Sequence, residues 1–193
     1  MKNPPKKKFS PKEYEYVGPK EILQMIKAKY RGTVIEESEE IRNWIGANHK
    51  NTKFGDVAIC TFTINLQGKL VIADRHSEHV QCAFGEKVRS AGEIGFVVEK
   101  KNEVYVDSIT NQSTGYCPSS ESWFEVEKAL KAILQLKGLS EFKGFDPAFI
   151  FSYCPDCKTR QIVKDEFYFC LKCEEELLSE GEFQMKRGGL EFR

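Results

Sequence analysis

Four cysteines near the C-terminus form two pairs with the same internal spacing. The first pair is Cys154-Pro-Asp-Cys157, and the second, Cys170-Leu-Lys-Cys173, follows after twelve intervening residues. Such spacing is typical of a four-thiolate zinc site, because each pair places two sulfurs on one tight turn and two turns complete a tetrahedron. Since four thiolates leave no open coordination position, we predict one structural zinc per chain.

The residues around these pairs are predicted to form a zinc ribbon that spans residues 149–178. Its expected hairpin strands are residues 161–163 and 166–169. Glycine often follows the second cysteine of such a turn, because the backbone there tends toward positive φ. This chain has Lys158 and Glu174 instead. We expect each to cost about 1 kcal/mol, which is small beside the roughly 10–16 kcal/mol that a structural zinc supplies.

The composition describes a neutral globular chain. Its 29 Lys and Arg balance 29 Asp and Glu, so no overall field favours nucleic acid or an anionic membrane. The first residues lack the apolar region of a signal peptide, and no apolar run is long enough to span a bilayer. The remaining cysteines are isolated and odd in number: Cys60, Cys82 and Cys117. We therefore predict a cytoplasmic protein without a membrane partner. The sequence leaves its oligomeric state open.

The hydrophobic pattern predicts an α+β fold ahead of the ribbon. Helices are expected after Pro19 and after Ser38. Short apolar and alternating runs predict about five antiparallel strands, and the short turns between most of them favour a meander. A further helix over residues 121–137 carries an apolar stripe that we expect to pack on the sheet.

This pattern divides the chain into four parts. Residues 1–18 are predicted to be a basic flexible arm, residues 19–148 the α+β domain, residues 149–178 the ribbon and residues 179–193 a flexible tail. The first twelve residues contain five Lys and no acid. Such an arm serves as a solubilising tail or contacts nucleic acid or an acidic partner.

A polar stretch follows the second strand of the clearest hairpin. It contains His76, Glu78 and His79 within residues 74–82. Strand ends and loops are where a scaffold presents reactive groups. We therefore take these three side chains as candidates for a ligand pocket.

A second polar cluster follows a later strand. Its members are Asn111, Ser113, Tyr116 and Cys117, and Glu93 lies beside the Ala-Gly pair before them. If the strand ends meet in the fold, the two clusters form one pocket.

Several other interpretations of these clusters remain open. His76, His79 and Cys82 could hold a second metal, and Cys117 with a histidine could form a nucleophile pair. A His-x-Glu pair also occurs in zinc deaminases, but the Pro-Cys-x-x-Cys that those enzymes need is not present beside it. In the simplest interpretation, these side chains only satisfy hydrogen bonds at turns and at the sheet edge.

The motif order resembles that of an uncharacterised bacterial family over about residues 56–178. The resemblance rests on Asp74-Arg-His-Ser-Glu-His, Ala91-Gly-Glu and Asn111-Gln-Ser-Thr-Gly-Tyr-Cys-Pro, followed by the ribbon. It implies no particular activity, because the family has none assigned.

A more distant similarity links the clusters to a module of plant IQ-motif proteins. That module has His-Ser-Ser, Ala-Gly and Ser-Gly-His-Tyr before a proline, and the matching positions are His76-Ser77, Ala91-Gly92 and Ser113-Thr-Gly-Tyr116. Glu78 replaces the second serine, and no histidine precedes the tyrosine. The similarity implies that the two clusters form one site.

Two functions follow from these features. In the first, the central domain binds a small or nucleotide-like ligand, with or without catalysis. In the second, the ribbon and the basic arm form a non-enzymatic module that binds nucleic acid or protein. The basic residues Lys158, Arg160 and Lys164 favour the second function, and the acidic run 174–176 opposes it.

Overall fold

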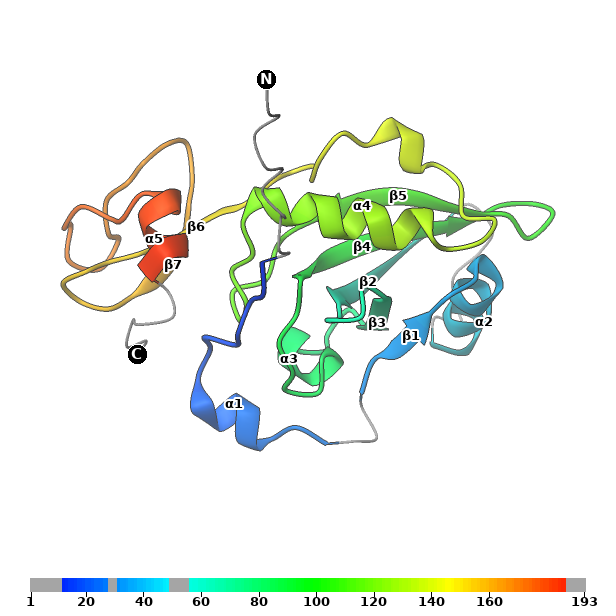
Figure 1. Ribbon diagram of the computed structural model, residues 1–193, viewed down its shortest axis with the longest axis horizontal. Helices are drawn as coiled ribbons and strands as arrows, with labels where there is room; N and C mark the ends of the chain where they lie inside the picture. Colours follow the sequence, from blue (N-terminus) through cyan, green and yellow to red (C-terminus); the bar gives the residue numbers. More distant parts are fainter. Residues whose placement is uncertain (1–11, 28–30, 49–55, 187–193) are drawn as a thin grey trace, which may run out of the picture.

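A five-stranded antiparallel sheet forms the centre of the protein (Figure 1). The computed structural model describes residues 12–27, 31–48 and 56–186. The strands are β1 (Thr33–Ile35), β2 (Val57–Ile64), β3 (Leu70–Asp74), β4 (Ser90–Val98) and β5 (Val104–Thr110), and their order is β1-β3-β2-β4-β5. The predicted α+β class and strand number are confirmed.

The connectivity differs from the predicted meander. The strand β4 pairs with β2 rather than with β3, so the chain crosses the sheet between β3 and β4 by way of the short helix α3 (His79–Cys82). The burial of β2 explains this order, because six of its eight residues are buried. Because the buried backbone N–H and C=O groups on both edges of β2 need hydrogen-bond partners, the strand pairs with a neighbour on each side.

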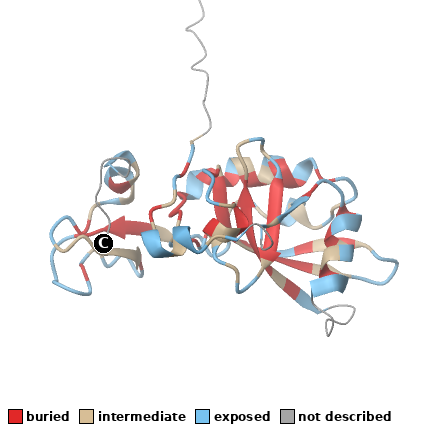
Figure 2. Ribbon diagram, turned by 90° about the horizontal axis from the view of Figure 1, so that it is seen from below, coloured by how far each residue is buried: buried red, intermediate tan, exposed pale blue. Residues whose placement is uncertain are grey.

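The main core lies between the sheet and two helices, α2 (Ser38–Asn48) and α4 (Trp123–Lys131). Their apolar side chains pack against residues of all five strands, which are largely buried in Figure 2. The helix α4 is shorter than predicted: it follows a 3-10 turn at Ser120–Ser122 and ends at Lys131. The following residues are not helical because their backbone N–H groups donate hydrogen bonds to other segments. Leu134 N donates to Glu36 O, and Lys137 N donates to Val104 O.

The segment 12–18, here called the strap, packs against the domain, so the prediction of a flexible arm is wrong for these residues. The Tyr14 side chain is buried, and its hydroxyl lies 2.8 Å from the Ser119 hydroxyl. The backbone of Tyr14 exchanges two hydrogen bonds with Val88, and Val17 N donates to Gly115 O. Helix α1 (Lys20–Gln24) follows. Residues 1–11 of the predicted arm lie outside the described residues.

The ribbon lies at one end of the molecule (Figure 1) and contains β6 (Ile150–Tyr153) and β7 (Arg160–Val163). These strands pair across the first cysteine turn, so the predicted hairpin of 161–163 with 166–169 is wrong. Asp165 and Glu166 both have positive φ, which interrupts the extended backbone before residue 167.

The tail is also more ordered than predicted. Residues Glu180–Lys186 form α5, and its Phe183 is fully buried. Ser179 and Glu182 begin this helix as a capping box: each receives a hydrogen bond from the other's backbone N–H, at 3.3 Å and 3.0 Å. The apolar anchor and the cap explain why this segment folds. Residues 187–193 of the predicted tail lie outside the described residues.

Gly92 is required where β4 meets β5. A Cβ on Gly92 would lie 1.9 Å from the Thr110 carbonyl oxygen, whereas a Cβ on Gly46 in α2 would meet no atom within 4 Å. We predict that Gly92→Ala lowers the free energy of unfolding by about 3 kcal/mol, because backbone must move. Gly46→Ala should raise it by about 0.5–1 kcal/mol. Urea denaturation of the two variants measures both effects, and equal stabilities would contradict this account of the strand contact.

Candidate functional site

The four paired cysteines converge on one point and can hold a metal ion. Their sulfur atoms all lie within 4.8 Å of one another. Cys154 Sγ is 3.5 Å from Cys173 Sγ, and Cys157 Sγ is 3.4 Å from Cys170 Sγ. Four sulfurs at about 2.3 Å from one zinc would be about 3.8 Å apart, so the observed spacing fits a single tetrahedral ion.

Both cysteine turns have the same backbone geometry. In each, the residue after the second cysteine donates its N–H to the carbonyl of the first cysteine, at 3.1 Å and 2.9 Å. That residue is Lys158 in one turn and Glu174 in the other, and both have φ of 62°. The predicted positive φ is therefore confirmed. The positive φ at Lys158 and Glu174 is a strained conformation, and it allows the two turns to place their sulfur atoms opposite one another.

Further hydrogen bonds prepare the sulfurs for a cation. Cys157 N donates to Cys154 Sγ and Lys172 N to Cys170 Sγ, both at 3.4 Å. The hydrogen bond with the Thr159 hydroxyl lowers the pKa of the Cys157 thiol to about 6. Such contacts orient metal ligands and stabilise thiolate charge.

The ribbon is joined to the α+β domain along an interface that we call the seam, formed by β6, α5, the strap and the loop 111–118. Val17, Cys117 and Phe183 pack there with Phe151 and Tyr153. The seam also has polar contacts: Arg160 Nη1 to Thr114 O at 2.6 Å, and Gln184 Nε2 to Cys117 O at 3.0 Å.

Asn111 is the central polar contact of the seam rather than a pocket residue. Its Nδ2 donates to Pro118 O and Phe149 O, both at 2.9 Å, and its Oδ1 accepts from Phe149 N at 2.6 Å. These bonds hold the loop 111–118 against the entry to β6. A buried amide with both ends bonded is poorly available to a ligand.

The structure brings the two predicted polar clusters together. His79 Nε2 lies 3.0 Å from Gly92 O, and Tyr116 packs in one apolar cluster with Val80. The Tyr116 hydroxyl donates to Glu86 O at 2.7 Å. The side chains of His79 and Tyr116 are thus bonded to backbone groups, as is that of Asn111.

Burial fixes the protonation of two of these side chains. It lowers the pKa of His79 to about 4, against the opposing effect of the Gly92 carbonyl. The imidazole is neutral at pH 7, and its Nε2 carries the proton that Gly92 O accepts. Burial also raises the pKa of Tyr116 well above its usual value, so this hydroxyl remains a donor.

Cys117 and the proposed second metal site find no support. The Cys117 thiol is buried in the seam and donates to Thr114 O at 3.3 Å, which is not the setting of an exposed nucleophile. Cys82 Sγ faces Thr63 Oγ1 at 3.8 Å and Val71 O at 3.7 Å. Within residues 12–27, 31–48 and 56–186, only the four-cysteine group gathers three potential ligands.

The remaining candidates are less constrained. His76 and Glu78 are exposed, and Glu93 is half-buried. Among the described residues, the Glu93 carboxylate has no ion pair or hydrogen bond, and neither does the buried Ser113 hydroxyl. These four side chains are what the motifs leave available for a ligand.

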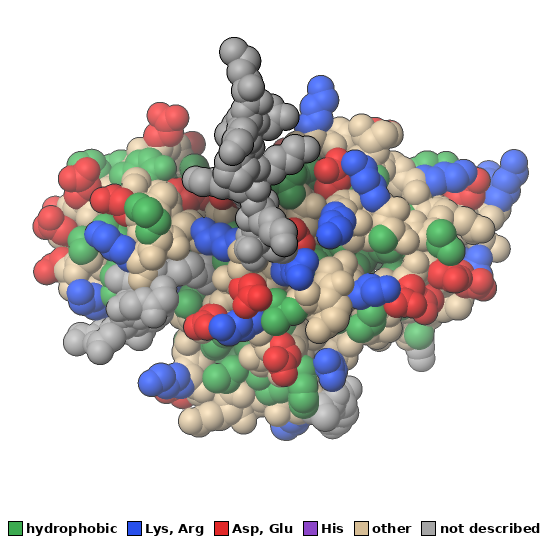
Figure 3. All heavy atoms as spheres, in the orientation of Figure 1, with side chains coloured by type: hydrophobic (Ala, Val, Ile, Leu, Met, Phe, Trp, Pro, Cys, Tyr) green, Lys and Arg blue, Asp and Glu red, His purple; other side chains and the backbone are tan. Residues whose placement is uncertain are grey.

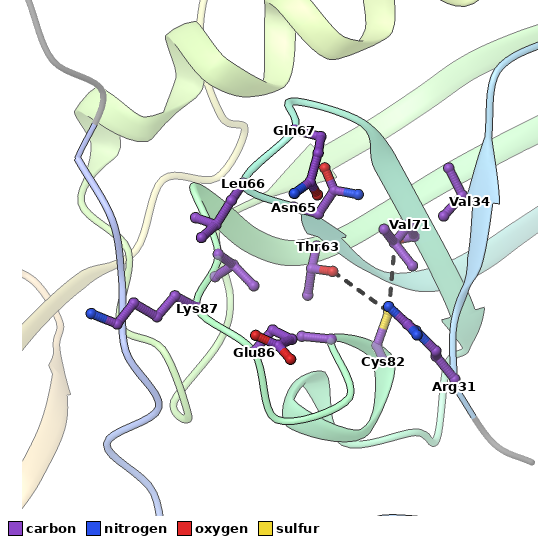
Figure 4. Close-up of a pocket in the computed structure, with 12 residues that line it drawn as sticks. Arg31, Val34, Thr63, Asn65, Leu66, Gln67, Val71, Cys82, Glu86 and Lys87 are labelled. Atoms are coloured by element: carbon purple, nitrogen blue, oxygen red, sulfur yellow. Dashed lines mark hydrogen bonds between the residues drawn. The ribbon is translucent and has the colours of Figure 1, made fainter. Parts of the chain in front are cut away.

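A cavity lies beside these clusters, on the α3 side of the sheet (Figure 4). Its volume is about 320 Å³, and its polar lining includes Arg31, Thr63, Asn65, Gln67 and Cys82. None of the eight predicted pocket residues lines this cavity. Of its polar lining residues, only Cys82 belongs to a stretch that the sequence singled out for chemistry.

Comparison with protein-family models, curated proteins and solved structures finds no match to this chain. Among the described helices, none has the length and apolar character needed to cross a membrane.

Cysteine substitution tests the metal centre. We predict that Cys154→Ser releases the metal and increases hydrogen exchange in β6 and β7, because the first cysteine turn loses one of its two metal ligands. Lys158→Gly should retain the metal and stabilise the ribbon by about 1 kcal/mol, because glycine relieves the positive φ. Elemental analysis with hydrogen-exchange mass spectrometry distinguishes the variants. Full metal retention and unchanged exchange in Cys154→Ser would contradict the assignment.

His79 predicts a pH dependence of stability. The folded state holds this imidazole neutral down to a pKa of about 4, whereas its ordinary value is 6.5. Between these two pH values the unfolded state binds a proton that the folded state does not. The free energy of unfolding therefore falls as the pH falls from 6.5 toward 4. The ratio of folded to unfolded protein decreases by at most about tenfold per pH unit. Urea denaturation at pH 7 and pH 5 should show a smaller loss for His79→Gln than for wild type.

The control for this measurement is His76→Gln, since His76 is exposed. It should keep the wild-type difference between the two pH values. Metal release at low pH affects all three proteins alike. The same pH dependence in His79→Gln and wild type would show that His79 titrates normally in the folded state.

Proposed function

We propose that the central domain binds a small polar ligand in the cavity on the α3 side of the sheet, and that the ribbon carries a structural zinc. The observation that carries this proposal is the cavity itself. Its volume of about 320 Å³ lies at the lower end of the range of about 300–1,000 Å³ for small-molecule sites.

The charged residues of the lining are Arg31, Lys87 and Glu86, and Arg31 is the one that favours an anionic group on the ligand. The Arg31 guanidinium lies 5.2 Å from the Phe84 ring centroid and has no ion pair with a described residue. Lys87 instead pairs with Glu15 at 2.5 Å and extends away from the other lining side chains in Figure 4. A carboxylate or phosphate on the ligand would therefore meet Arg31.

The remaining lining favours hydrogen bonding over covalent chemistry. Asn65 Oδ1 accepts from Lys69 N at 2.9 Å, which leaves the Asn65 amide N–H groups for a ligand. The thiol at the cavity floor belongs to Cys82, and burial raises its pKa to about 12. A thiol that stays protonated is a poor nucleophile. Binding of a small, nucleotide-like or carboxylate ligand is thus the proposed function, in the cytoplasm predicted from cysteine usage.

Zinc is the metal that the four thiolates fit best, because soft sulfur ligands in a tetrahedral set select it over harder cations. All four positions are filled by protein. The metal would stabilise the ribbon, and the cysteine set offers no position at which water could be activated.

The alternative function is an interaction module built on the ribbon. Its basic residues support binding of nucleic acid only weakly, because Arg160 bonds Thr114 O and Lys158 Nζ bonds Pro155 O. The basic residues before Lys12 lie outside the described part. Exposed apolar side chains on the ribbon favour a protein partner instead.

Ligand-dependent melting tests the cavity. Nucleoside phosphates, free nucleosides and simple carboxylic acids are the probes. We predict that at least one anionic probe raises the melting temperature of wild type, by the equivalent of about 2.7 kcal/mol at 100 times its Kd. Arg31→Ala should abolish the shift, because it removes the cation at the cavity.

The matched control is Glu93→Gln, because Glu93 lies in β4 and does not line the cavity. It should leave the shift unchanged. A shift lost in Glu93→Gln but kept in Arg31→Ala would instead place the ligand at the polar cluster that contains Glu93, His76 and Glu78. No shift with any probe would refute the ligand-binding proposal.

A further inference from the structure

We infer that the outer surface of the ribbon binds a basic polypeptide segment of a partner protein that carries an apolar anchor residue. The surface, here called the ribbon face, consists of Phe167, Phe169 and Leu171 with the acidic residues around them. The ribbon face is separate from the cavity, so this inference does not depend on the ligand proposal.

Three large apolar side chains are exposed within five residues. Phe167 is 53% exposed, Phe169 47% and Leu171 81%. The two phenylalanine rings lie 5.4 Å apart between centroids, so they form one contact surface. Isolated exposed apolar residues are ordinary on protein surfaces, but a contiguous group marks a site of interaction.

The backbone holds these side chains in a fixed arrangement. The Gln161 side chain of β7 donates to Phe169 O and accepts from Leu171 N, both at 3.1 Å. Phe167 N donates to Lys164 O at 2.9 Å and closes the turn before it. Leu171 lies inside the second cysteine turn, so metal binding would immobilise it. A preorganised surface loses less entropy when a partner binds.

The turn that presents Phe167 is strained. Asp165 and Glu166 are consecutive residues with φ of 52° and 57°, a conformation that side chains other than glycine adopt at a cost. Neither residue has an ion pair with a described residue. Strain without internal compensation is found at surfaces that bind something.

Charge selects the class of partner. Residues 164–176 contain five acids against two lysines. The acids are Asp165, Glu166, Glu174, Glu175 and Glu176, all of them exposed. Figure 3 shows acidic side chains along the outer edge of the ribbon with apolar ones between them. Such a rim repels phosphate and attracts Lys and Arg, which favours a basic polypeptide over nucleic acid.

Fluorescence anisotropy of a labelled peptide tests the ribbon face. The probe is Gly-Lys-Lys-Phe-Lys-Lys-Gly, with one matched peptide in which alanine replaces phenylalanine and one in which glutamate replaces lysine. We predict that the full-length protein binds the probe and that both matched peptides bind more weakly. The triple variant Phe167→Ala/Phe169→Ala/Leu171→Ala should weaken binding about tenfold, as the loss of buried anchors does.

Two further variants separate the apolar and acidic contributions. Asp165→Asn/Glu175→Gln/Glu176→Gln should weaken binding several-fold and reduce its dependence on salt, because fewer ion pairs form. Phe124→Ala/Leu134→Ala removes two apolar side chains of similar exposure far from the ribbon in sequence and should bind as wild type does. Metal content and melting temperature confirm that each variant is folded.

Three results would overturn the inference. The first is equal binding of the probe by wild type and the Phe167 triple variant. The second is tighter binding of a single-stranded oligonucleotide than of the probe, together with weaker oligonucleotide binding by the Phe167 triple variant. This result would assign the surface to nucleic acid. The third is binding that begins only when residues 1–11 are removed, which would make this chain's own basic segment the occupant.

Discussion

Closure of two cysteine turns around one point is the interaction on which the C-terminal ribbon of this protein depends. The ribbon buries few residues in its own interior, where the inner cluster consists of Cys154, Cys170, Val163 and Leu177. A module of this size cannot fold on so small a core without a metal or other cross-link. A bound metal would also offset the strain at Lys158 and Glu174, because the free energy of metal binding is larger than the cost of their positive φ.

The seam extends this constraint to the rest of the chain. Asn111 ties the loop 111–118 to the start of β6, and Phe183 of α5 packs against Cys117 of that loop. Val17 brings the strap into the same cluster. Three segments far apart in the sequence therefore meet at the ribbon. Loss of the metal should loosen the loop as well as the ribbon, because they share these contacts.

The sequence predicted the elements whose signals are local. Alternating residues located β2 and its hairpin partner, and the Cys-x-x-Cys spacing located the metal centre with its positive φ values. Pairing between distant segments was not predictable in this way. The position of β4 beside β2 depends on burial of both faces of β2, and the early end of α4 depends on backbone bonds that Leu134 and Lys137 make with other segments.

The polar motifs show the same limit. Polarity in Asn111, Tyr116 and His79 indicated a pocket, but each side chain is bonded to a backbone group across the fold. Polar residues that join segments and polar residues that bind ligands are of the same residue types, so the sequence alone does not distinguish them. The cavity was missed for the opposite reason, because its lining comes from separate segments: Arg31 precedes β1, Thr63 and Gln67 lie in the β2–β3 hairpin, and Cys82 lies in α3. The capping box at Ser179 was a local signal that could have located α5.

Metal content per chain tests the central claim most directly. Protein is purified without added metal, and zinc is measured by elemental analysis in wild type and in the double variant His76→Ala/His79→Ala. The account predicts one zinc per chain in both proteins, held by Cys154, Cys157, Cys170 and Cys173. Two metals in wild type and one in the double variant would contradict a purely structural ribbon and place a second metal at the histidines. Absence of zinc from folded wild-type protein would contradict the metal centre itself.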